Sequence, residues 1–477
     1  MLTNKVHSAV NENTMTKDTI EPTMMAGSQI TDPDNFDGQG EISACMSIRT
    51  SLSPIITWLK VFGFYYDNPL CADIARLSDA NPKHSHAKHM EQWAHRSDIN
   101  ETGAAIAPRS SKSLGIYRVF TAVSSSLTKY SQFLHQSYCI IVSLLLVANF
   151  LKSLLLLFRG SGFGMSYRVV MVIWYSHTTL GSLALHYSCR KDNHFKLFFN
   201  QWVQQFNHPK AKALGFTPTT CRKWVLIVTS TAMAALLLNV VLVAVFTLVE
   251  EIPMSKYQKI LICQPFPVTW WSLLLALITH MFNSAAWTLL SGFTVCLALV
   301  MATHFSRLKN LIRTSVEGSD IHFPANLPHL RLCHLRMCGV LDTLNHYFRL
   351  YLAVSMSSSI ATSTFILYQI VAVRSDQWTL VGNVWWFLGT LLAVLATSIS
   401  LSMLHEAAHS PLEELFSIDS AQADTAQTIQ LQLFLHKLTG TTIGATVLDL
   451  VVVTKEVLLT VLGAFLTYFF LVMQFGI

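Results

Sequence analysis

Seven apolar stretches dominate this chain, and each is long enough to cross the hydrocarbon core of a bilayer, which takes about 20 helical residues. They run near residues 137–158, 164–188, 224–248, 268–303, 347–373, 383–404 and 453–475. The fourth is longer than a bilayer needs, so its end is expected to continue as helix into water. With 52% hydrophobic and 13% charged residues, the chain is also too apolar for an ordinary soluble protein. The sequence therefore predicts an all-α, polytopic membrane protein with seven transmembrane helices.

Lysine and arginine in the connections predict the orientation, because cytoplasmic loops carry the positive excess. The second connection is strongly basic, with Arg190, Lys191, Lys196, Lys210, Lys212, Arg222 and Lys223. The fourth holds Arg307, Lys309, Arg313, Arg331 and Arg336, whereas the opposite connections hold far fewer basic residues. The N-terminus is therefore predicted inside and the C-terminus outside, the reverse of a G-protein-coupled receptor. This pattern accounts for the net charge of +6 without a nucleic-acid partner.

Three regions follow from this layout. Residues 1–112 are polar and are predicted to form a cytosolic, largely disordered arm with no secretory signal peptide. Within it, residues 53–69 place apolar side chains at helical spacing, which predicts a short amphipathic segment lying against the membrane or the domain. Residues 113–404 are expected to hold the first six transmembrane helices, including a cytoplasmic helix over 304–346. Residues 405–477 are expected to form a mostly helical cytoplasmic anchor and the seventh transmembrane helix.

A metal-binding pattern stands at the end of the sixth stretch. His405, Glu406 and His409 spell H-E-x-x-H, which on a helix presents two imidazoles to zinc with the glutamate as general base. An intramembrane zinc metalloprotease is therefore an alternative function. Pro411 disfavours further helix, however, and no recognisable motif surrounds the candidate third ligands Glu413, Glu414, Asp449 and Glu456. We favour a polar cap on the sixth helix, with no catalytic residue and no metal.

Other motifs are interpreted without a site. The histidines of the arm, His84, His86, His89 and His95, are read as a solvated segment, although metal binding is an alternative. Cys333, His334 and Cys338 have helical spacing, and residues 160–164 form a turn rather than a nucleotide loop. A glycosylation sequon at Asn100 is expected to be hidden in the cytosol. No cofactor is predicted.

Aromatic and polar side chains in the spans are the candidate ligand-binding residues. Tryptophan pairs at the outer ends of the fourth and sixth stretches either belong to an interfacial belt or roof a ligand pocket: Trp270, Trp271, Trp385 and Trp386. Polar groups in mid-membrane usually face a cavity or the bundle interior, because facing lipid is costly. The candidates of this kind are Tyr175, His177, His280, Asn283, Thr364, Tyr368 and Gln369.

The last stretch carries a weakly polar stripe. Thr460, Thr467 and Gln474 recur every seven residues, and Gly463, Ala464 and Leu471 lie on the same side. Such a stripe either packs against another helix through small residues or lines a narrow aqueous path.

The segment Thr467 to Phe475, TYFFLVMQF, resembles the TYhhhhhQF signature that closes insect gustatory receptors, where h is hydrophobic. Its position at the end of the seventh span also matches. Residues 330–360 and 54–66 resemble the family's helix before the fifth span and its N-terminal leader. One departure is Phe469, which stands where sugar-receptor members often carry an acid and so disfavours that branch.

The resemblance implies a ligand-gated, nonselective cation channel in the plasma membrane, passing Na⁺, K⁺ and Ca²⁺. It implies a homotetramer, or a heteromer with related receptors, in which four copies of the last helix surround the pore. Carried over, the pore and gate residues are Gln474, Phe475, Leu471 and Thr467. We further expect Glu406, Glu413, Glu414, Asp449 and Glu456 to place negative charge near the inner mouth. The ligand, a small-molecule tastant, stays open among sugars, bitter compounds and other stimuli. A membrane transporter is a weaker alternative, because the sequence has no internal repeat.

Overall fold

The structure, a computed structural model, describes residues 38–66, 111–159, 165–189, 194–218, 221–249, 263, 266–318, 323–372, 376–419 and 423–475. All of them except Gly38 belong to one compact unit, Gln39–Ile477. Most of the predicted arm lies outside the described residues. So do the histidines at 84–95, Asn100 and the turn at 160–164.

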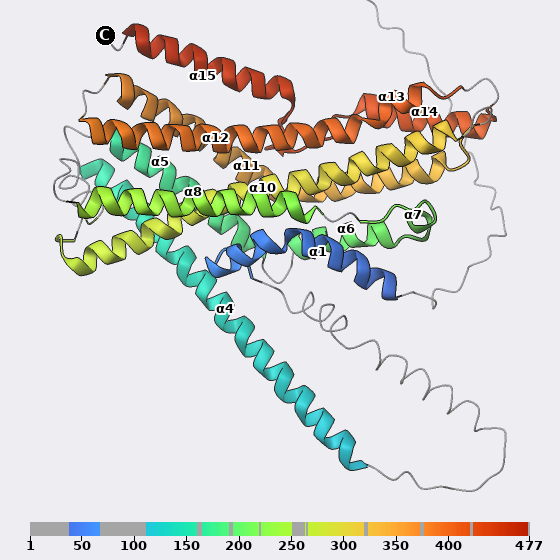
Figure 1. Cartoon of the computed structure of the whole chain (residues 1–477), viewed down its shortest axis with the longest axis horizontal. Helices are drawn as coiled ribbons and strands as arrows, with labels where there is room; N and C mark the ends of the chain where they lie inside the picture. The colour runs from blue at the N-terminus through green and yellow to red at the C-terminus, as the bar shows by residue number, and fades with distance from the viewer. Residues whose placement is uncertain are drawn as a thin grey trace, which may run out of the picture. The chain divides into compact units, whose positions relative to one another are not determined.

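Helices account for nearly all of the described residues (Figure 1), and the predicted all-α class is confirmed. In chain order they are α1 (Gly38–Val61), α4 (Ser111–Arg159), α5 (Met165–Ser188), α6 (His194–Asn207), α7 (Pro209–Ala213), α8 (Arg222–Leu248), α10 (Trp270–Glu317), α11 (Leu327–Ala372), α12 (Gln377–His409), α13 (Pro411–Phe416), α14 (Thr425–Gly440) and α15 (Lys455–Phe475). The strands β1 (Thr446–Val447) and β2 (Val451–Val452) form a small antiparallel hairpin before α15.

Each of the seven apolar stretches coincides with a helix. Within the described residues, five helices are long and apolar enough to cross a membrane: Phe133–Phe158 of α4, then α8, α10, α11 and the helical run that begins with α12. The second and seventh stretches correspond to α5 and α15. At 48 residues, α10 is about 70 Å long and must extend well beyond a hydrocarbon core of about 30 Å. The stretch 304–346 comprises the end of α10 and the start of α11.

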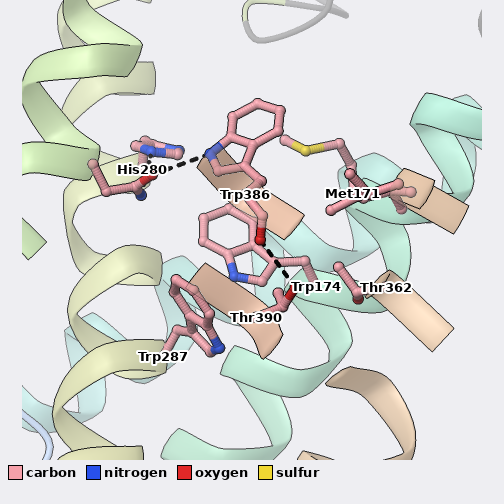
Figure 2. A pocket seen from close by; sticks show the side chains of 10 residues that line it. Met171, Trp174, His280, Trp287, Thr362, Trp386 and Thr390 are labelled. Carbon is pink, nitrogen blue, oxygen red and sulfur yellow. Dashed lines mark hydrogen bonds between the residues drawn. The ribbon is translucent and has the colours of Figure 1, made fainter. Parts of the chain in front are cut away.

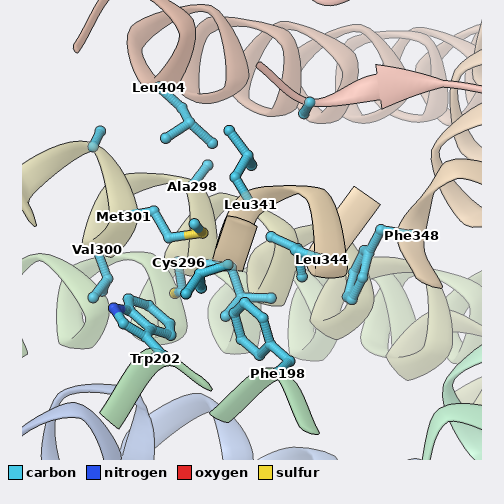
Figure 3. Packing of buried hydrophobic residues seen from close by; sticks show 14 of the residues in the cluster. Phe198, Trp202, Cys296, Ala298, Val300, Met301, Leu341, Leu344, Phe348 and Leu404 are labelled. Atoms are coloured by element: carbon cyan, nitrogen blue, oxygen red, sulfur yellow. The ribbon is translucent and has the colours of Figure 1, made fainter. Parts of the chain in front are cut away.

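The long helix α10 is the central element of the bundle. Its most apolar window is 78% buried, against 28% for the corresponding windows of α4 and α8. It contacts α5, α8 and α12 along its length. Figure 3 shows how Cys296, Ala298 and Met301 of α10 lie among side chains from α6 and α11, including Trp202 and Leu341. Small residues on α10 thus let several helices pack closely around it.

The amphipathic helix α1 packs into this same core. Leu52, Ile55 and Leu59 are fully buried. The Tyr138 hydroxyl of α4 donates to the carbonyl of Val61 at 2.8 Å, so the end of α1 is tied to the bundle. After the helix, the chain turns at Gly63, whose φ of +74° suits glycine, and any Cβ there would meet Val142 of α4 at 2.9 Å.

The segment between α12 and α15 is compact. Pro411 is tolerated at the first turn of α13, where no helical hydrogen bond from its nitrogen is needed. The hairpin that follows α14 turns through Leu448 and Asp449, which have φ values of 53° and 58°. This left-handed conformation is unfavourable for a leucine.

Candidate ligand pocket and pore helix

A pocket lies between α5, α8, α10, α11 and α12, in their apolar portions. It is lined by Val170, Met171, Trp174, Asn239, His280, Trp287, Thr362, Ile366, Trp386 and Thr390. Figure 2 shows three tryptophans converging on this space, one each from α5, α10 and α12. The cavity volume is about 40 Å³, enough for a few water molecules. A larger ligand would have to displace side chains.

Asn239 organises the polar side of the pocket. Its amide oxygen accepts a hydrogen bond from the Trp386 indole nitrogen at 3.1 Å. Its amide nitrogen donates to the Ser284 hydroxyl at 2.8 Å and lies 3.4 Å from the ring nitrogen Nε2 of His280. The His280 ring also faces Trp174, with ring centroids 5.3 Å apart. This network joins α8, α10 and α12, and it positions Trp386 by a hydrogen bond and Trp174 by a ring contact.

The pocket presents an aromatic and uncharged surface. None of its described lining residues is Asp, Glu, Lys or Arg. The hydroxyl of Thr390 donates within its own helix, to the carbonyl of Trp386 at 2.9 Å, and accepts from Ser363 at 2.9 Å. Because the polar groups mostly satisfy one another, a bound molecule would meet chiefly apolar surface. Such a pocket suits a small neutral ligand with few hydrogen-bonding groups.

Two of the predicted ligand-binding residues, His280 and Trp386, meet in this pocket. Asn283 is buried and accepts a hydrogen bond from Thr178 at 2.7 Å, and His177 is buried against Tyr351. Tyr175 faces a separate groove next to α4.

The remaining predicted residues do not line the pocket. Trp270 and Trp271 are 78% and 81% exposed, as residues of an interfacial belt would be. Trp385 and Thr364 are half-buried, Tyr368 is exposed and Gln369 is buried.

Sequence reasoning missed Trp174, Asn239 and Trp287, among other lining residues. Asn239 interrupts the apolar run of α8, and a lone amide in mid-span is a signal that could have identified it. The two tryptophans lie within their spans rather than at the ends, where a belt would place them.

The stripe on α15 is open along its length. Thr460, Gly463, Thr467 and Gln474 are all exposed, and a Cβ added at Gly463 would meet nothing within 4 Å. Leu471 is 45% exposed. Phe475 is the last residue of the helix, and its side chain lies outside the described part. Contacts of α15 with α11 and α12 join the helix to two walls of the pocket.

The H-E-x-x-H residues bind the chain that leads to α15. His409 donates from Nδ1 to the carbonyl of Leu438 at 3.0 Å and accepts the Ile443 amide at Nε2, also at 3.0 Å. His405 donates from Nδ1 to the Ile443 carbonyl at 2.7 Å. Both nitrogens of His409 are thus engaged by backbone. Within the described residues, no group of three His, Cys, Asp or Glu side chains is arranged to hold a metal.

Ion pairs occupy most of the acids that were expected to charge the inner mouth. Glu406 pairs with Lys455, Asp449 pairs with Arg349, and Lys309 lies 3.9 Å from both Glu413 and Glu414. The hydrogen bond from Arg349 holds the pKa of Asp449 below its ordinary value. This pairing reduces the negative field that the acids alone would create.

Comparisons with known proteins agree with this architecture. A family model described as 7tm Chemosensory receptor matches residues 127–477. The insect olfactory receptor OR5 from Machilis hrabei is similar in structure, with a TM-score of 0.55 and 12% identity, over 81% of this chain and 98% of that one. The same receptor in complex with eugenol has a TM-score of 0.58, at the same identity and coverage. No curated protein matches the chain by sequence. At this identity the structural likeness shows the fold alone.

Proposed function

The chain belongs to the 7tm chemosensory receptor family, and from this premise we propose that it is a gustatory receptor acting as a tastant-gated, nonselective cation channel in the plasma membrane. The observation that carries the proposal is the aromatic pocket beside α11 and α12, the two helices that also contact α15. A ligand that changes the packing of α11 or α12 can therefore influence α15 through helices that contact both the pocket and α15.

Four copies of the chain would surround the pore, each contributing α15. The exposure of the α15 stripe supports the assembly, because Thr460, Thr467 and Gln474 are all exposed and polar side chains are costly to place against lipid. Gln474, Leu471 and Thr467 would then face the pore. Apolar rings close a pore by excluding water, whereas amide groups can coordinate cations that pass.

The preferred ligand would be a small, neutral, largely apolar molecule rather than a sugar. A sugar carries many hydroxyl groups, and each would need a partner when buried. The pocket's polar atoms are few and mostly engaged, as the Asn239 network illustrates. Eugenol, the ligand in the complex of the Machilis hrabei receptor, is consistent with this class. Gating requires that the ligand bind the open arrangement more tightly than the closed one.

Adjacent tryptophans offer a matched test. Trp386 lines the pocket, whereas Trp385 does not. In cells expressing the receptor, a panel of neutral aromatic compounds and sugars is screened by calcium flux, and the best agonist is then applied to both alanine variants. Trp386→Ala should raise the half-maximal concentration by about 30-fold, since a buried tryptophan contact is worth about 2 kcal/mol. Trp385→Ala should change it less than about threefold. Equal shifts at equal surface expression would contradict the pocket, and the absence of any ligand-evoked cation current would contradict the channel.

A further inference from the structure

A second concave site lies on the outside of the bundle, between α4 and α10. This α4–α10 groove has a volume of about 450 Å³, which is within the range of ligand pockets and far larger than the 40 Å³ of the aromatic pocket. Its walls are largely apolar, with Leu145 and Leu155 on α4 and Leu275 and Ala276 on α10. A molecule that is too large for the resting aromatic pocket therefore fits in the groove.

The groove opens onto the lipid-facing surface, since Leu151 and Leu274 beside it are exposed in the chain. Its polar side chains on α4 are already engaged: Asn149 is hydrogen-bonded to Tyr175 of α5, and Lys152 has a partner of its own. Among the described lining residues, no charged side chain is thus left for a ligand. An occupant that arrives from the bilayer would be neutral and apolar, which is the class of molecule that suits the aromatic pocket.

One layer of side chains separates the groove from the aromatic pocket. Tyr175 lines the groove and its neighbour Trp174 lines the pocket, with ring centroids 5.1 Å apart. On α10, Thr279 lines the groove and its neighbour His280 lines the pocket. The rings of Trp174 and His280, both drawn in Figure 2, lie 5.3 Å apart and bridge α5 and α10. Rotation of these rings would therefore join the two spaces.

Two other approaches to the pocket are closed by packing. At the outer ends of α5 and α8, Tyr167 and Phe246 form a buried cluster. A Cβ at Gly382 of α12 would lie only 3.1 Å from the Phe246 ring, so this outer cluster has little spare room. On the inner side, the Thr178 hydroxyl donates to Asn283 at 2.7 Å and ties α5 to α10. The side-chain layer beside the groove is thus the easiest barrier to open.

We propose that the α4–α10 groove is the entry vestibule of the receptor: a small neutral molecule dissolved in the bilayer binds there and passes between α5 and α10 into the aromatic pocket. This inference rests on the proposed function, because it assigns a route to the same ligand. A barrier on the route changes the rates of binding and release by the same factor and leaves the affinity unchanged, because the free and bound states stay the same. A wrong route would therefore leave ligand-evoked current intact, whereas a wrong function would abolish it.

The test follows eugenol binding to the full-length protein in phosphatidylcholine nanodiscs by stopped-flow tryptophan fluorescence. This signal reports entry into a pocket lined by three tryptophans and needs no channel current. The double variant Ala148→Phe/Ala276→Phe narrows the groove from both walls. It should slow association and dissociation alike by at least about fivefold, which corresponds to about 1 kcal/mol of added barrier, and leave Kd unchanged. Tyr175→Phe releases the ring from Asn149 and should speed both rates.

Control variants separate the groove from general effects. Ala234→Phe adds the same bulk at an exposed position in the apolar span of α8 and should change neither rate. Gly382→Ala tightens the outer cluster and should also leave both rates unchanged. Either single phenylalanine variant serves if the double variant is not monodisperse.

Three results would overturn the proposal. Slowing by Gly382→Ala, with rates unaltered by the groove variants, would place entry on the outer side. A groove variant that raises Kd without slowing dissociation would make the groove a second binding site rather than a route. Absence of saturable eugenol binding to the wild-type protein would remove the shared ligand class on which the route depends.

Discussion

The histidines of the H-E-x-x-H motif should stabilise the packing of α12 against the chain between α14 and α15, and His409→Ala tests this directly. The substitution removes the Nδ1 donor to the Leu438 carbonyl and the Nε2 acceptor of the Ile443 amide. Two backbone groups near the hairpin that precedes α15 would lose their partners. The packing of α12 against α14 and this hairpin should loosen.

The magnitude follows from the number of groups left unpaired. A buried polar group without a partner costs about 1–3 kcal/mol. Since His409 is half-buried, water can reach part of the site, and the lower end applies to each group. We therefore expect a loss of about 2–3 kcal/mol in the free energy of unfolding. With an unfolding entropy of about 2.1 cal/mol/K per residue, a chain of this size loses about 1 °C of Tm per kcal/mol, so a decrease of roughly 3 °C is expected.

Thermal unfolding of the detergent-solubilised protein measures this shift. The matched control is His436→Ala, because His436 is an exposed histidine on α14 and its loss should change stability by less than about 0.5 kcal/mol. His409→Gln can still accept the Ile443 amide and should recover about half of the lost Tm. If His409→Ala melts within about 1 °C of His436→Ala, this stabilising role of His409 is refuted. Stoichiometric zinc in purified protein that is lost in His405→Ala would instead support the protease alternative.

Three further predictions concern the hairpin and the pore helix. Leu448→Gly should raise the free energy of unfolding by about 0.5–1 kcal/mol, because it relieves a left-handed leucine that costs about 1–2 kcal/mol while adding chain entropy to the unfolded state. Leu450 does not have a positive φ, so Leu450→Gly should show no gain in the same thermal assay. Asp449→Asn should lower Tm at pH 7, and its difference from wild type should vanish as pH falls through the folded-state pKa of Asp449. The pKa is lowered by Arg349, so this stabilisation is present above the ordinary pKa of aspartate and lost below the folded one; a difference that persists at low pH would contradict the ion pair. Gln474→Ala should change the permeability ratio for Na⁺ and Ca²⁺ in ligand-evoked currents, and currents unaltered by substitutions of both Gln474 and Phe475 would remove the pore assignment.

Helix positions could be predicted from the sequence because a bilayer imposes one length and one polarity on every span. The stretch near 224–248 coincides with α8 within two residues at its start, and the stretch near 453–475 coincides with α15. The break at Pro411 was also readable from local sterics. Span positions and this helix break depend on the bilayer and on neighbouring residues, so the sequence alone predicts them.

The pocket could be predicted only in part, because its lining depends on which faces of five helices converge. His280 and Trp386 were identified, yet their shared partner Asn239 comes from a third helix and carries no motif. Likewise, Trp385 and Trp386 are equivalent in the sequence, and only the packing of α12 distinguishes them. The acids Glu406, Glu413, Glu414, Asp449 and Glu456 were expected to place negative charge near the inner mouth. Glu406 and Asp449 pair with Lys455 and Arg349, which lie on other helices, and such pairings are set by packing.

The burial of α1 has a consequence for biosynthesis. Ile55 lies near Gly292 of α10, and the Phe62 ring lies 6.2 Å from that of Phe282, so the helix docks onto residues made more than 200 positions later. At about 5–20 residues per second, the ribosome needs roughly 10–50 s to deliver them. During that interval the apolar face of α1 has no core to bury it. An amphipathic helix can then bury this face in the membrane interface. The N-terminal helix is therefore among the first elements synthesised, yet it cannot reach its final position until α10 has been made.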